Sequence, residues 1–451
     1  MPLPREVALV WDFQPKEWMP PEREAFYGKN KLMKNINPGV TVKTIEEANK
    51  RLKGVVKKTP LQFSKRLSKL YKARVYFKRE DLQEVRSYKI RGAYNLMSSL
   101  ANSEKEKGVV CASAGNHAQG VAFGASMLKV RGTIFMPVTT PLQKVSRVKQ
   151  FGGRWVKVEL VGTTYDESST AAKDYCKKIG AVFVHPFDDE RVISGQGTVG
   201  KEIFDQAGEK LDYVLCPVGG GGLISGVGTY LKTKVKDVKL VGVEPKGATG
   251  MYQSLKNGKV ITLESIDPFV DGVAVRTVGN KTFEISSKLV DQMLLVDEGK
   301  VCTTMIDLYQ NEGIVTEPAG ALSIAALDNL AGKIEGKTVV CILSGGNNDI
   351  LRYPEIMEKS LVYQGRKHYF IVEFAQKPGQ LKKFVNSVLD STDDIVRFEY
   401  IKKNSKETGP ALVGVELAKK EDFQPLINRM DRLGIKYTVI TSKDVLYSYL
   451  I

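Results

Sequence analysis

A lysine in the segment RSYKIRGAYN, residues 86–95, is the first side chain whose surroundings suggest chemistry. Lys89 follows a bulky ring, Tyr88, and precedes Gly92 and Ala93, two small residues that would let a helix lie close to its neighbours. A lysine packed into such a tight segment loses the water around its amine, which lowers its pKa and makes it a nucleophile and a base. Lys89 is therefore the candidate catalytic residue.

A glycine run, PVGGGGLISGVG at residues 217–228, directly follows an apolar run expected to be a strand. Adjacent glycines let the backbone approach a ligand, and their N–H groups at the start of a helix can hold a phosphate. The run contains neither G-x-G-x-x-G nor G-x-x-x-x-G-K-[ST]. It therefore predicts a phosphate site for a ligand other than a dinucleotide or ATP.

A second loop, CASAGNHAQG at residues 111–120, also lies between an expected strand and an expected helix. The amides of such a loop, at a helix N-terminus, suit a carboxylate. Asparagine is also a common helix cap, so Asn116 could serve only that purpose.

A third loop, ILSGGNND at residues 342–349, ends the last apolar run of this region. The Ser344 hydroxyl, placed at the carboxyl end of a strand, could meet a ligand there. A Ser-Gly-Gly turn is common in loops, so this signal is weak by itself.

A phosphate loop, a carboxylate loop and a lysine in a tight segment together indicate pyridoxal 5'-phosphate as the cofactor. The lysine would form a Schiff base with it, and Tyr88 would cover one side of the site.

From about residue 41 to its end, the chain resembles the biosynthetic threonine dehydratases, which are fold-type II pyridoxal phosphate enzymes related to tryptophan synthase β. The segments that carry the resemblance are, in order, FKREDLQEVRSYKIRGAYN, ASAGNHAQGVAFGA, MPVTTPLQKVSRVKQFGG, PVGGGGLISG, DGVAVRTVG and LSGGNND. The C-terminal part is similar to the ACT-like regulatory domain of that family, present once.

The resemblance implies a role for each matching residue. Lys89 would bind the cofactor and then take the α-proton of the substrate. Asn116 would bond the cofactor's 3-hydroxyl oxygen, and Ser344 would meet its pyridine nitrogen. The residues implied to hold the phosphate are Gly219, Gly220, Gly221, Gly222 and Leu223. Those implied to frame the substrate carboxylate are Ser113, Gly115, Asn116 and His117.

The reaction implied is the deamination of L-threonine to 2-oxobutyrate and ammonia, the first step of isoleucine biosynthesis. A serine at the ring nitrogen makes the ring a weak electron sink, which favours prompt loss of a β-hydroxyl over transamination. The alternative is a serine dehydratase or serine racemase of the same fold type, acting on L-serine. Similar racemases have a serine where Ala114 stands and an acidic metal ligand where Gly250 stands. Both departures speak against racemisation, and no metal site is expected.

The elements that must position these residues form an alternating pattern between residues 73 and 350. Most of the apolar runs are apolar at nearly every position, as strands covered on both faces are. The expected strands are 74–78, 108–112, 132–136, 154–160, 182–185, 212–216, 239–243 and 338–343, with helices such as 142–151 and 164–179 between them. The pattern predicts an α/β fold with parallel sheets in two lobes, a catalytic domain over 41–360 with a small lobe at about 81–184.

The pattern changes near residue 360, and residues 366–451 follow the order β-α-β-β-α-β of a ferredoxin-like α+β domain. The expected strands are 368–374, 395–401, 411–417 and 436–441, and the expected helices are 378–389 and 421–434. The resemblance implies that isoleucine binds as an allosteric inhibitor, with valine as a candidate antagonist, in a homotetramer. The strand residues expected to pair with another copy are Phe370, Val372, Val413 and Val415.

Composition limits the remaining classes of function. The chain has 451 residues, 26% of them charged, and no apolar run of about 18 residues that would suggest a membrane span. The net charge is +16, and residues 48–79 hold twelve basic residues and no acid. Apolar positions recur through that stretch and no nucleic-acid motif accompanies it, so we expect a helix and a strand with a solvated basic face rather than a nucleic-acid surface.

Five scattered cysteines and three histidines favour a reducing compartment and no structural zinc site. Residues 1–40 lie outside the resemblance and form an extension of unknown role, with Trp11, Phe13, Trp18 and Phe26 as candidate docking anchors. The stretch has no secretory pattern and is too acidic for a typical transit peptide. We expect a cytoplasmic enzyme, with an organellar location left open.

Overall fold

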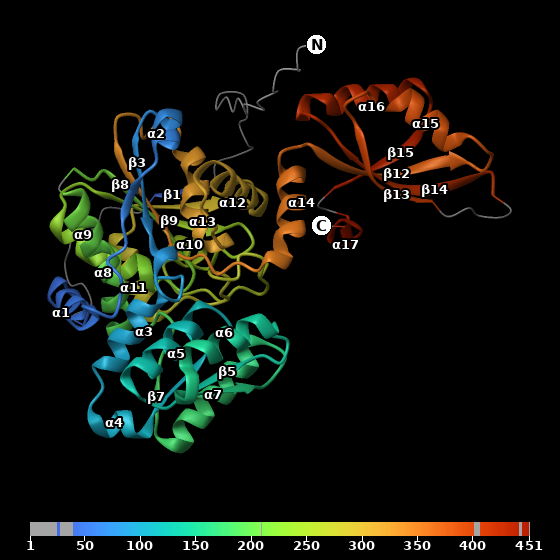
Figure 1. Cartoon of the computed structure of the whole chain (residues 1–451). Helices are drawn as coiled ribbons and strands as arrows, with labels where there is room; N and C mark the ends of the chain where they lie inside the picture. Colours follow the sequence, from blue (N-terminus) through green and yellow to red (C-terminus); the bar gives the residue numbers. More distant parts are fainter. Residues whose placement is uncertain (1–24, 28–38, 209, 401–405, 442–443, 451) are drawn as a thin grey trace, which may run out of the picture.

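The structure, a computed structural model, describes residues 25–27, 39–208, 210–400, 406–441 and 444–450. It contains a seven-stranded sheet and two four-stranded sheets, the last of them in a separate C-terminal domain (Figure 1). The expected anchors Trp11, Phe13 and Trp18 lie outside the described residues, as does the side chain of Phe26.

The large lobe is built on the seven-stranded sheet, in the order β1-β10-β9-β8-β11-β3-β2. Its strands are β1 (Ala25–Tyr27), β2 (Leu61–Phe63), β3 (Arg74–Arg79), β8 (Tyr213–Pro217), β9 (Lys239–Pro245), β10 (Gln292–Val296) and β11 (Thr338–Leu343). The five central strands are parallel and the two edge strands are antiparallel. The glycine run follows β8 and the Ser344 loop follows β11, so both lie at the carboxyl edge of the sheet, where ligands bind in open α/β sheets.

The small lobe is built on a parallel sheet in the order β6-β5-β4-β7. Its strands are β4 (Val109–Ala112), β5 (Gly132–Met136), β6 (Val156–Leu160) and β7 (Val182–Phe183). Two expected strands are shorter than predicted. Arg154 and Trp155 lie in a 3-10 turn, because Gly153 with φ 51° turns the chain there. The strand at 182 ends after Phe183, because His185 turns back to accept hydrogen bonds from the next amides.

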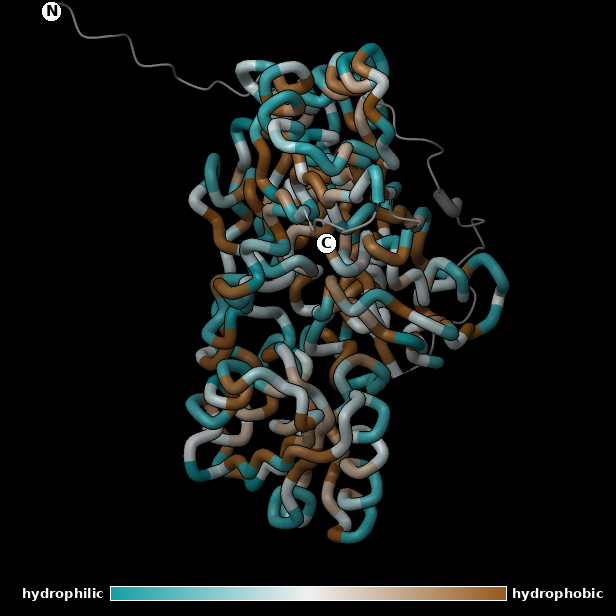
Figure 2. The backbone as a smooth tube through the Cα atoms, turned by 90° about the vertical axis from the view of Figure 1, so that its right-hand side faces the viewer, coloured by the Kyte–Doolittle hydropathy of each residue, from teal (hydrophilic) through white to brown (hydrophobic). Residues whose placement is uncertain are grey.

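Helices cover both sheets, which explains the uniformly apolar strands. The helices of the large lobe are α1 (Val42–Leu52), α2 (Lys65–Tyr71), α8 (Glu190–Ala207), α9 (Gly222–Lys234), α10 (Gly250–Asn257), α11 (Asn280–Leu289), α12 (Glu298–Glu312) and α13 (Pro318–Ala325). Those of the small lobe are α3 (Lys89–Ser98), α4 (Asn102–Lys107), α5 (Asn116–Leu128), α6 (Leu142–Gly152) and α7 (Tyr165–Ile179). Capping boxes at Thr41 and Thr164 begin α1 and α7. Figure 2 shows hydrophobic stretches running through the interior of both lobes.

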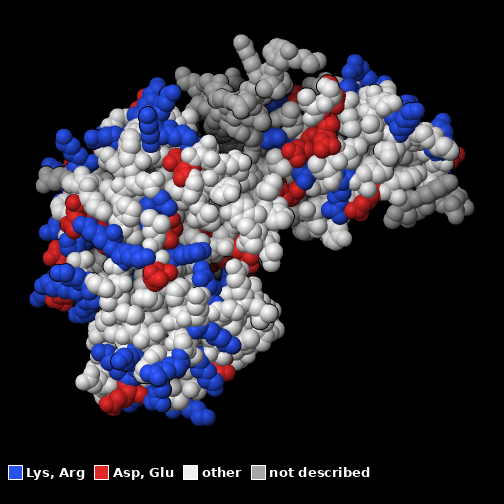
Figure 3. Space-filling view, in the orientation of Figure 1, with Lys and Arg blue, Asp and Glu red and all other residues white. Residues whose placement is uncertain are grey.

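The basic stretch at 48–79 folds into α1, β2, α2 and β3, so the expected helix and strand are present. Its apolar residues Leu67, Val75 and Phe77 are buried. Several of its cations pair with acids elsewhere in the chain, among them Arg66 with Asp307. Lys and Arg side chains gather on the side of the large lobe where α1 and α2 lie (Figure 3).

The C-terminal domain has the predicted order β-α-β-β-α-β, with an antiparallel sheet in the order β13-β14-β12-β15. Its elements are β12 (Lys367–Ala375), α15 (Gln380–Val388), β13 (Asp394–Tyr400), β14 (Thr408–Glu416), α16 (Phe423–Arg432), β15 (Lys436–Ile440) and a final α17 (Tyr447–Leu450). The expectation that Phe370, Val372, Val413 and Val415 pair with another copy is wrong. All four are fully buried in the core of the domain itself, because they face α15 and α16.

Helix α14 (Tyr353–Tyr363) joins the C-terminal domain to the large lobe. It packs against α12, and its Ile356 belongs to the core of the large lobe. On its other side, Glu358 accepts a hydrogen bond from the Tyr369 hydroxyl of β12 at 2.7 Å. The helix is therefore packed on both parts of the chain. Within the described residues, the structure has no helix long and apolar enough to cross a membrane.

Candidate active site

Lys89 is the first residue of α3, and its amine points into the protein. Its Nζ donates a hydrogen bond to the backbone oxygen of Pro186 at 3.0 Å and lies 5.3 Å from the centre of the Tyr88 ring. The side chain keeps partial contact with solvent, yet the loss of water around it lowers the pKa of Lys89 to about 8, against an opposing effect of Glu317. Near neutral pH, part of the Lys89 population is therefore unprotonated and able to accept a proton.

The residues before Lys89 pair with the loop that follows β11. The Tyr88 N–H donates to the backbone oxygen of Ser344 at 3.1 Å, and the Gly346 N–H donates to that of Arg86 at 2.9 Å. Arg86 has φ 53°, a left-handed conformation that is uncommon for a residue with a side chain and tends to occur at functional sites. The pairing brings two of the sequence motifs side by side.

Ser344 is 2% exposed, and its hydroxyl donates to the backbone oxygen of Ala319 at 3.2 Å. The hydroxyl oxygen still has lone pairs to accept a hydrogen bond. This residue is therefore held at the carboxyl edge of β11, next to the segment that carries Lys89.

Asn116 begins α5 of the small lobe and is bonded at both ends of its amide. Its Nδ2 donates to Glu317 Oε1 at 2.7 Å, and its Oδ1 accepts from Asn347 Nδ2 at 2.7 Å. The Asn347 backbone N–H also donates to Glu317 Oε2 at 3.2 Å. Three loops distant in sequence therefore meet at one polar cluster.

Glu317 is the residue of this cluster that the sequence motifs did not reveal. It is the N-cap residue of α13, where it is 5% exposed, and burial raises its pKa to about 7, with Asp271 adding to the effect. Gly345 lies so close that a Cβ there would overlap the Glu317 carboxyl group. The sequence carried one signal for this residue, in the segment EPAGALSIA. Glu317 stands directly before a helix that begins with proline and contains a single polar residue, Ser323.

Two polar side chains of the carboxylate loop, residues 111–120, make contacts in different parts of the small lobe. Ser113 Oγ accepts from the Gly115 N–H at 3.2 Å, which closes the loop ahead of α5. His117 instead points into the small lobe, where its Nε2 contacts the Val184 backbone oxygen at 2.8 Å. Burial lowers the pKa of His117 to about 3, so its ring is neutral. The Ser113 hydroxyl and the first amides of α5 can donate to an anion, whereas the Gly115 N–H is bonded to Ser113 Oγ and the His117 ring is engaged elsewhere.

The glycine loop, Gly219 to Gly222, has no side chains to cover its backbone, and side chains at these positions would clash with neighbouring residues. A Cβ at Gly219 would lie 2.9 Å from the Val273 backbone, and one at Gly220 would overlap the Phe187 ring. Gly221 has φ 91°, which favours glycine, and Gly222 opens α9. Leu223 follows, 2% exposed, within the core of the large lobe. The sequence and the packing both require glycine here.

Glu244 lies in β9, ahead of Gly250, the first residue of α10. Both of its oxygens accept hydrogen bonds at 2.8 Å from the first amides of α10, those of Met251 and Tyr252. Burial raises the pKa of Glu244 to about 8. The carboxyl group therefore caps a helix.

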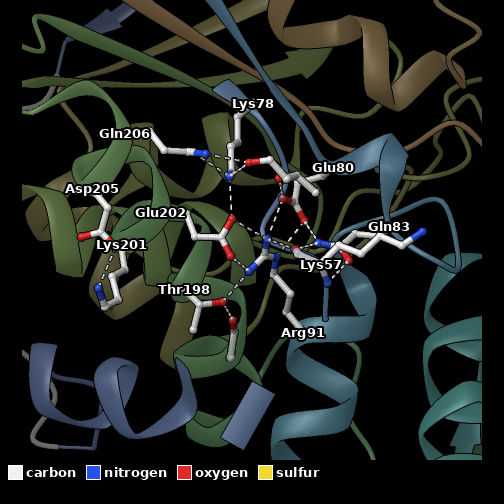
Figure 4. Close-up of polar contacts among 12 residues, drawn as sticks. Lys57, Lys78, Glu80, Gln83, Arg91, Thr198, Lys201, Glu202, Asp205 and Gln206 are labelled. Atoms are coloured by element: carbon white, nitrogen blue, oxygen red, sulfur yellow. Dashed lines mark hydrogen bonds and ion pairs between the residues drawn. The ribbon is translucent and has the colours of Figure 1, made fainter. Parts of the chain in front are cut away.

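A buried network of charges anchors α3, the helix that begins with Lys89 (Figure 4). The Arg91 guanidinium donates to both oxygens of Glu80 at 2.8 Å, and to both oxygens of Glu202 at 2.8 and 2.9 Å. Lys78 Nζ lies 2.5 Å from Glu202 Oε2 and 2.7 Å from the Thr59 backbone oxygen. Because Arg91 is two residues from Lys89, the network fixes the start of α3 against α8 and the end of β3.

The two lobes also meet through an ion pair outside this network. Lys144 Nζ of α6 lies 2.7 Å from Asp271 Oδ2 in the large lobe, with both groups partly exposed. Arg352, just before α14, lies 3.7 Å from the other oxygen of Asp271 and donates to the Phe269 backbone oxygen at 2.7 Å. Asp271 therefore joins the small lobe to the chain segment that leads into the C-terminal domain.

The residues present fit pyridoxal phosphate. Four glycines form a loop whose missing side chains leave backbone amides accessible at the start of α9, as a phosphate requires. Lys89, whose amine has a lowered pKa, begins α3 directly after Tyr88, which bonds the backbone of Ser344, a buried serine at the carboxyl edge of β11. The loop between β4 and α5 offers amides to a carboxylate.

Two family models match the chain. Residues 52–345 match the model described as pyridoxal-phosphate dependent enzyme, and residues 358–450 match the one described as C-terminal regulatory domain of threonine dehydratase.

Known proteins similar to the chain include biosynthetic L-threonine dehydratases of Halalkalibacterium halodurans and Bacillus subtilis. The first is 53% identical over 91% of this chain and 99% of its own length, and the second 50% over 92% and 98%. Among solved structures, threonine deaminase isoform 2 of Solanum lycopersicum has a TM-score of 0.71 and 38% identity over 76% of this chain and 94% of its own. Serine racemase of Dictyostelium discoideum has a TM-score of 0.64 and 34% identity over 69% and 100%.

Proposed function

This chain belongs to the biosynthetic L-threonine dehydratases of the pyridoxal-phosphate-dependent enzyme family, and we propose on that premise how its residues act and how it is regulated. It is an enzyme that deaminates L-threonine to 2-oxobutyrate and ammonia. The alternative substrate L-serine is less well supported, because the threonine dehydratases match nearly the whole chain, including its regulatory domain.

The observation that carries the assignment of the site is the position of Lys89. Its amine donates to the Pro186 backbone oxygen, next to Phe187, which packs against Gly220 of the glycine loop, and it lies close enough to Glu317 for that carboxyl group to raise its pKa. Bound pyridoxal phosphate would draw electrons from the substrate α-carbon and so make its proton acidic. Lys89 is the base that takes this proton, since its lowered pKa leaves part of it neutral.

The other residues orient the reactants. The loop of Ser113, Gly115 and Asn116 would hold the substrate carboxylate through amides at the start of α5. Gly219 to Gly222 and Leu223 would hold the phosphate, and Ser344 would meet the pyridine nitrogen without fixing a proton on it. Glu317 holds the Asn116 amide so that it faces the site in one orientation.

The test of the proposed activity is a product assay. Full-length protein with the cofactor should form 2-oxobutyrate from L-threonine at a higher kcat/KM than it forms pyruvate from L-serine. Lys89→Ala should form neither. A higher kcat/KM with L-serine would overturn the substrate assignment.

We further propose that isoleucine inhibits the enzyme through residues 366–451, with valine as an antagonist, in a homotetramer in the cytoplasm. The matching regulatory domain and its attachment through α14 support regulation. The apolar faces of β12 and β14 that point to α15 and α16 are buried, so a second copy that packs on the sheet would use its opposite face, where Ile371 and Leu412 are half-buried.

A chain that stops after Gln364 tests this regulation, because it keeps α14 on the catalytic part. The truncated chain should deaminate threonine and no longer respond to isoleucine. In the full-length protein, isoleucine should lower the affinity for threonine or the rate by about 5–150-fold. Inhibition that survives the truncation would place the isoleucine site elsewhere. Sedimentation of the full chain would test the tetramer.

A further inference from the structure

The short segment from His185 to Asp188 bridges two parts of the candidate active site. The Pro186 backbone oxygen accepts the hydrogen bond from Lys89, and the Phe187 ring packs against Gly220 in the glycine loop. His185 Nδ1 accepts from the amides of Phe187 and Asp188 at 3.2 and 2.8 Å, which folds the segment into a tight turn. The segment therefore touches both the base and the phosphate loop.

The far end of this segment is also fixed. The Asp188 carboxylate accepts hydrogen bonds from three amides at the start of α11, those of Asn280, Lys281 and Thr282. The Thr282 hydroxyl in turn donates to the Gly220 backbone oxygen at 2.6 Å. The position of the segment relative to the glycine loop is thus set from two directions.

Gln196, on α8, is the side chain that holds the Pro186 end. It is fully buried, and its Nε2 donates to the Pro186 backbone oxygen at 3.3 Å. This oxygen therefore accepts hydrogen bonds from both Lys89 and Gln196. The other end of its amide reaches Gly222, where a Cβ would overlap Gln196 Oε1. One side chain therefore contacts the acceptor of the Lys89 amine and the glycine loop at once.

Gln196 Oε1 is buried and has no hydrogen-bond partner among the described residues. Buried acceptors are rarely left without a partner, because they lose water and gain nothing in return. A methionine of similar length would fill the same volume, so what the glutamine adds is its amide. The Nε2 end bonds Pro186, and the Oε1 end can accept from a group bound at the glycine loop.

We propose that Gln196 is a positioning residue, which ties the Lys89 amine to the cofactor-phosphate loop through the Pro186 backbone oxygen on one side and Gly222 on the other. The inference rests on the proposed function, since it concerns the base and the cofactor of that reaction. Without the Gln196 amide, the Pro186 oxygen is free to shift, and the amine that it orients shifts with it. Misplacement of a reacting group by about 1 Å can cost about a hundredfold in rate.

Two variants of full-length, cofactor-loaded protein test the role. Gln196→Met keeps the length of the side chain and removes both polar atoms, while Gln196→Glu keeps the shape and, when ionised, has no N–H to donate. Both should lower kcat by about tenfold to a hundredfold with KM for L-threonine changed by less than about threefold. The visible circular dichroism of the bound cofactor should change in both, because it reports how the cofactor is held.

Gln424→Met is the matched control. Gln424 also lies on a helix, α16, and donates a hydrogen bond, to Asn428 Oδ1 at 2.9 Å, but it is exposed and belongs to the C-terminal domain. This variant should keep the kcat and the circular dichroism of the natural chain. The thermal midpoints of all variants should be similar, which separates positioning from a general loss of stability.

Wild-type kcat and circular dichroism in Gln196→Met would overturn the proposal. So would a loss of activity matched by a large fall in thermal midpoint with unchanged circular dichroism, since that result shows a structural role only. If Gln196→Met does not fold, Gln196→Glu decides by the same criteria. If the natural chain holds its cofactor but does not deaminate threonine, the proposed function fails, and the circular dichroism of the variants still tests Gln196.

Discussion

The amide of Asn116 lies 2.7 Å from the carboxyl group of Glu317, a contact between residues 201 positions apart that joins the small lobe to the large lobe. Because Asn347 holds the other end of the same amide, its orientation is fixed before any ligand binds. The lobe that carries the carboxylate loop is thus tied to a titrating group in the opposite lobe.

Glu317→Gln should therefore change how activity depends on pH. The pKa of Glu317 is about 7, so the group is ionised above that pH, and its negative charge raises the pKa of Lys89. Without this charge the pKa of Lys89 falls below about 8, and the acid limb of kcat should move to lower pH, with the maximal kcat reduced by about tenfold from the altered Asn116 contact.

The measurement is kcat for L-threonine between about pH 6 and 9, because kcat reports groups of the enzyme–substrate complex, in which Lys89 is free to act as a base. Glu298→Gln is the control, since burial also raises the pKa of Glu298, which bonds Gly247 and not the Asn116 cluster. Identical profiles for Glu317→Gln and the natural chain would refute the coupling.

Lys89→Ala should remove turnover. Loss of a general base alone costs about 10²–10⁴ in rate, and loss of the amine that binds the cofactor adds to it. In the natural chain, activity should rise as pH increases through about 8, because Lys89 accepts a proton only when it is neutral. Added methylamine should restore part of the activity of Lys89→Ala and none of that of a heat-inactivated sample. If Lys89→Ala turned over L-threonine at a rate close to that of the natural chain, Lys89 would not be the catalytic base.

The ion pair between Lys144 and Asp271 should support closure of the lobes on the substrate. The two side chains are 30% and 40% exposed, so the pair contributes about 0.2–1 kcal/mol, or up to about fivefold in KM. Lys144→Met and Asp271→Asn should each raise KM for L-threonine, and the double variant should be no worse than the poorer single one. Higher salt should raise KM in the natural chain only. Additive effects in the double variant would show that the pair does not act as a unit.

Arg91→Met should destabilise the protein strongly. It leaves Glu80 and Glu202 buried without their guanidinium, at a cost of about 3–5 kcal/mol in the free energy of unfolding. Arg131→Met is the control, because Arg131 is exposed and bonds only a backbone oxygen among the contacts described for it. Urea unfolding compares the two, and equal midpoints would mean that the network contributes nothing.

The same network determines how the free energy of unfolding falls at acidic pH. Burial by itself would raise the pKa of Glu80, but Arg91 and Lys78 outweigh it and lower the pKa below the ordinary value of 4.5. The stabilisation by Glu80 is therefore complete above about pH 4.5 and is lost as pH falls through the lowered value. The free energy of unfolding of Arg91→Met should depend less steeply on acid pH than that of the natural chain.

The sequence was enough to propose Lys89 and the ligand loops as candidate site residues and to predict most strands, because each of these depends on neighbours along the chain. Strand β4 is apolar throughout, β5 and β11 are apolar apart from one threonine each, and the glycine run needs no distant residue to be recognised. Local patterns failed where a partner lies far away in sequence. Glu317 acquires its role only from Asn116, and the segment after β7 looked like a strand until His185 was seen to turn it.

The regulatory domain shows the same limit in another form. The alternation of apolar and polar residues correctly predicted strands β12 and β14. It could not show which face of the sheet the helices α15 and α16 cover. Both faces of this sheet carry apolar residues, so Phe370 was assigned to an interface when it belongs to the core. A choice between two apolar faces is made by packing, which the period of a strand does not encode.

The pairing of β3 with β11 has a consequence for how the chain is made. β3 ends at Arg79, and the strand that completes its parallel side begins at Thr338, roughly 260 residues later. At about 5–20 residues per second, a ribosome takes roughly 10–50 s to supply it. The small lobe is made within that interval, and until its end Val75 and Phe77 stand on a strand that has no partner on its parallel side. The yield of active enzyme therefore depends on the speed of translation and on chaperones that shield this edge, and slower elongation between the two strands should increase aggregation of the nascent chain.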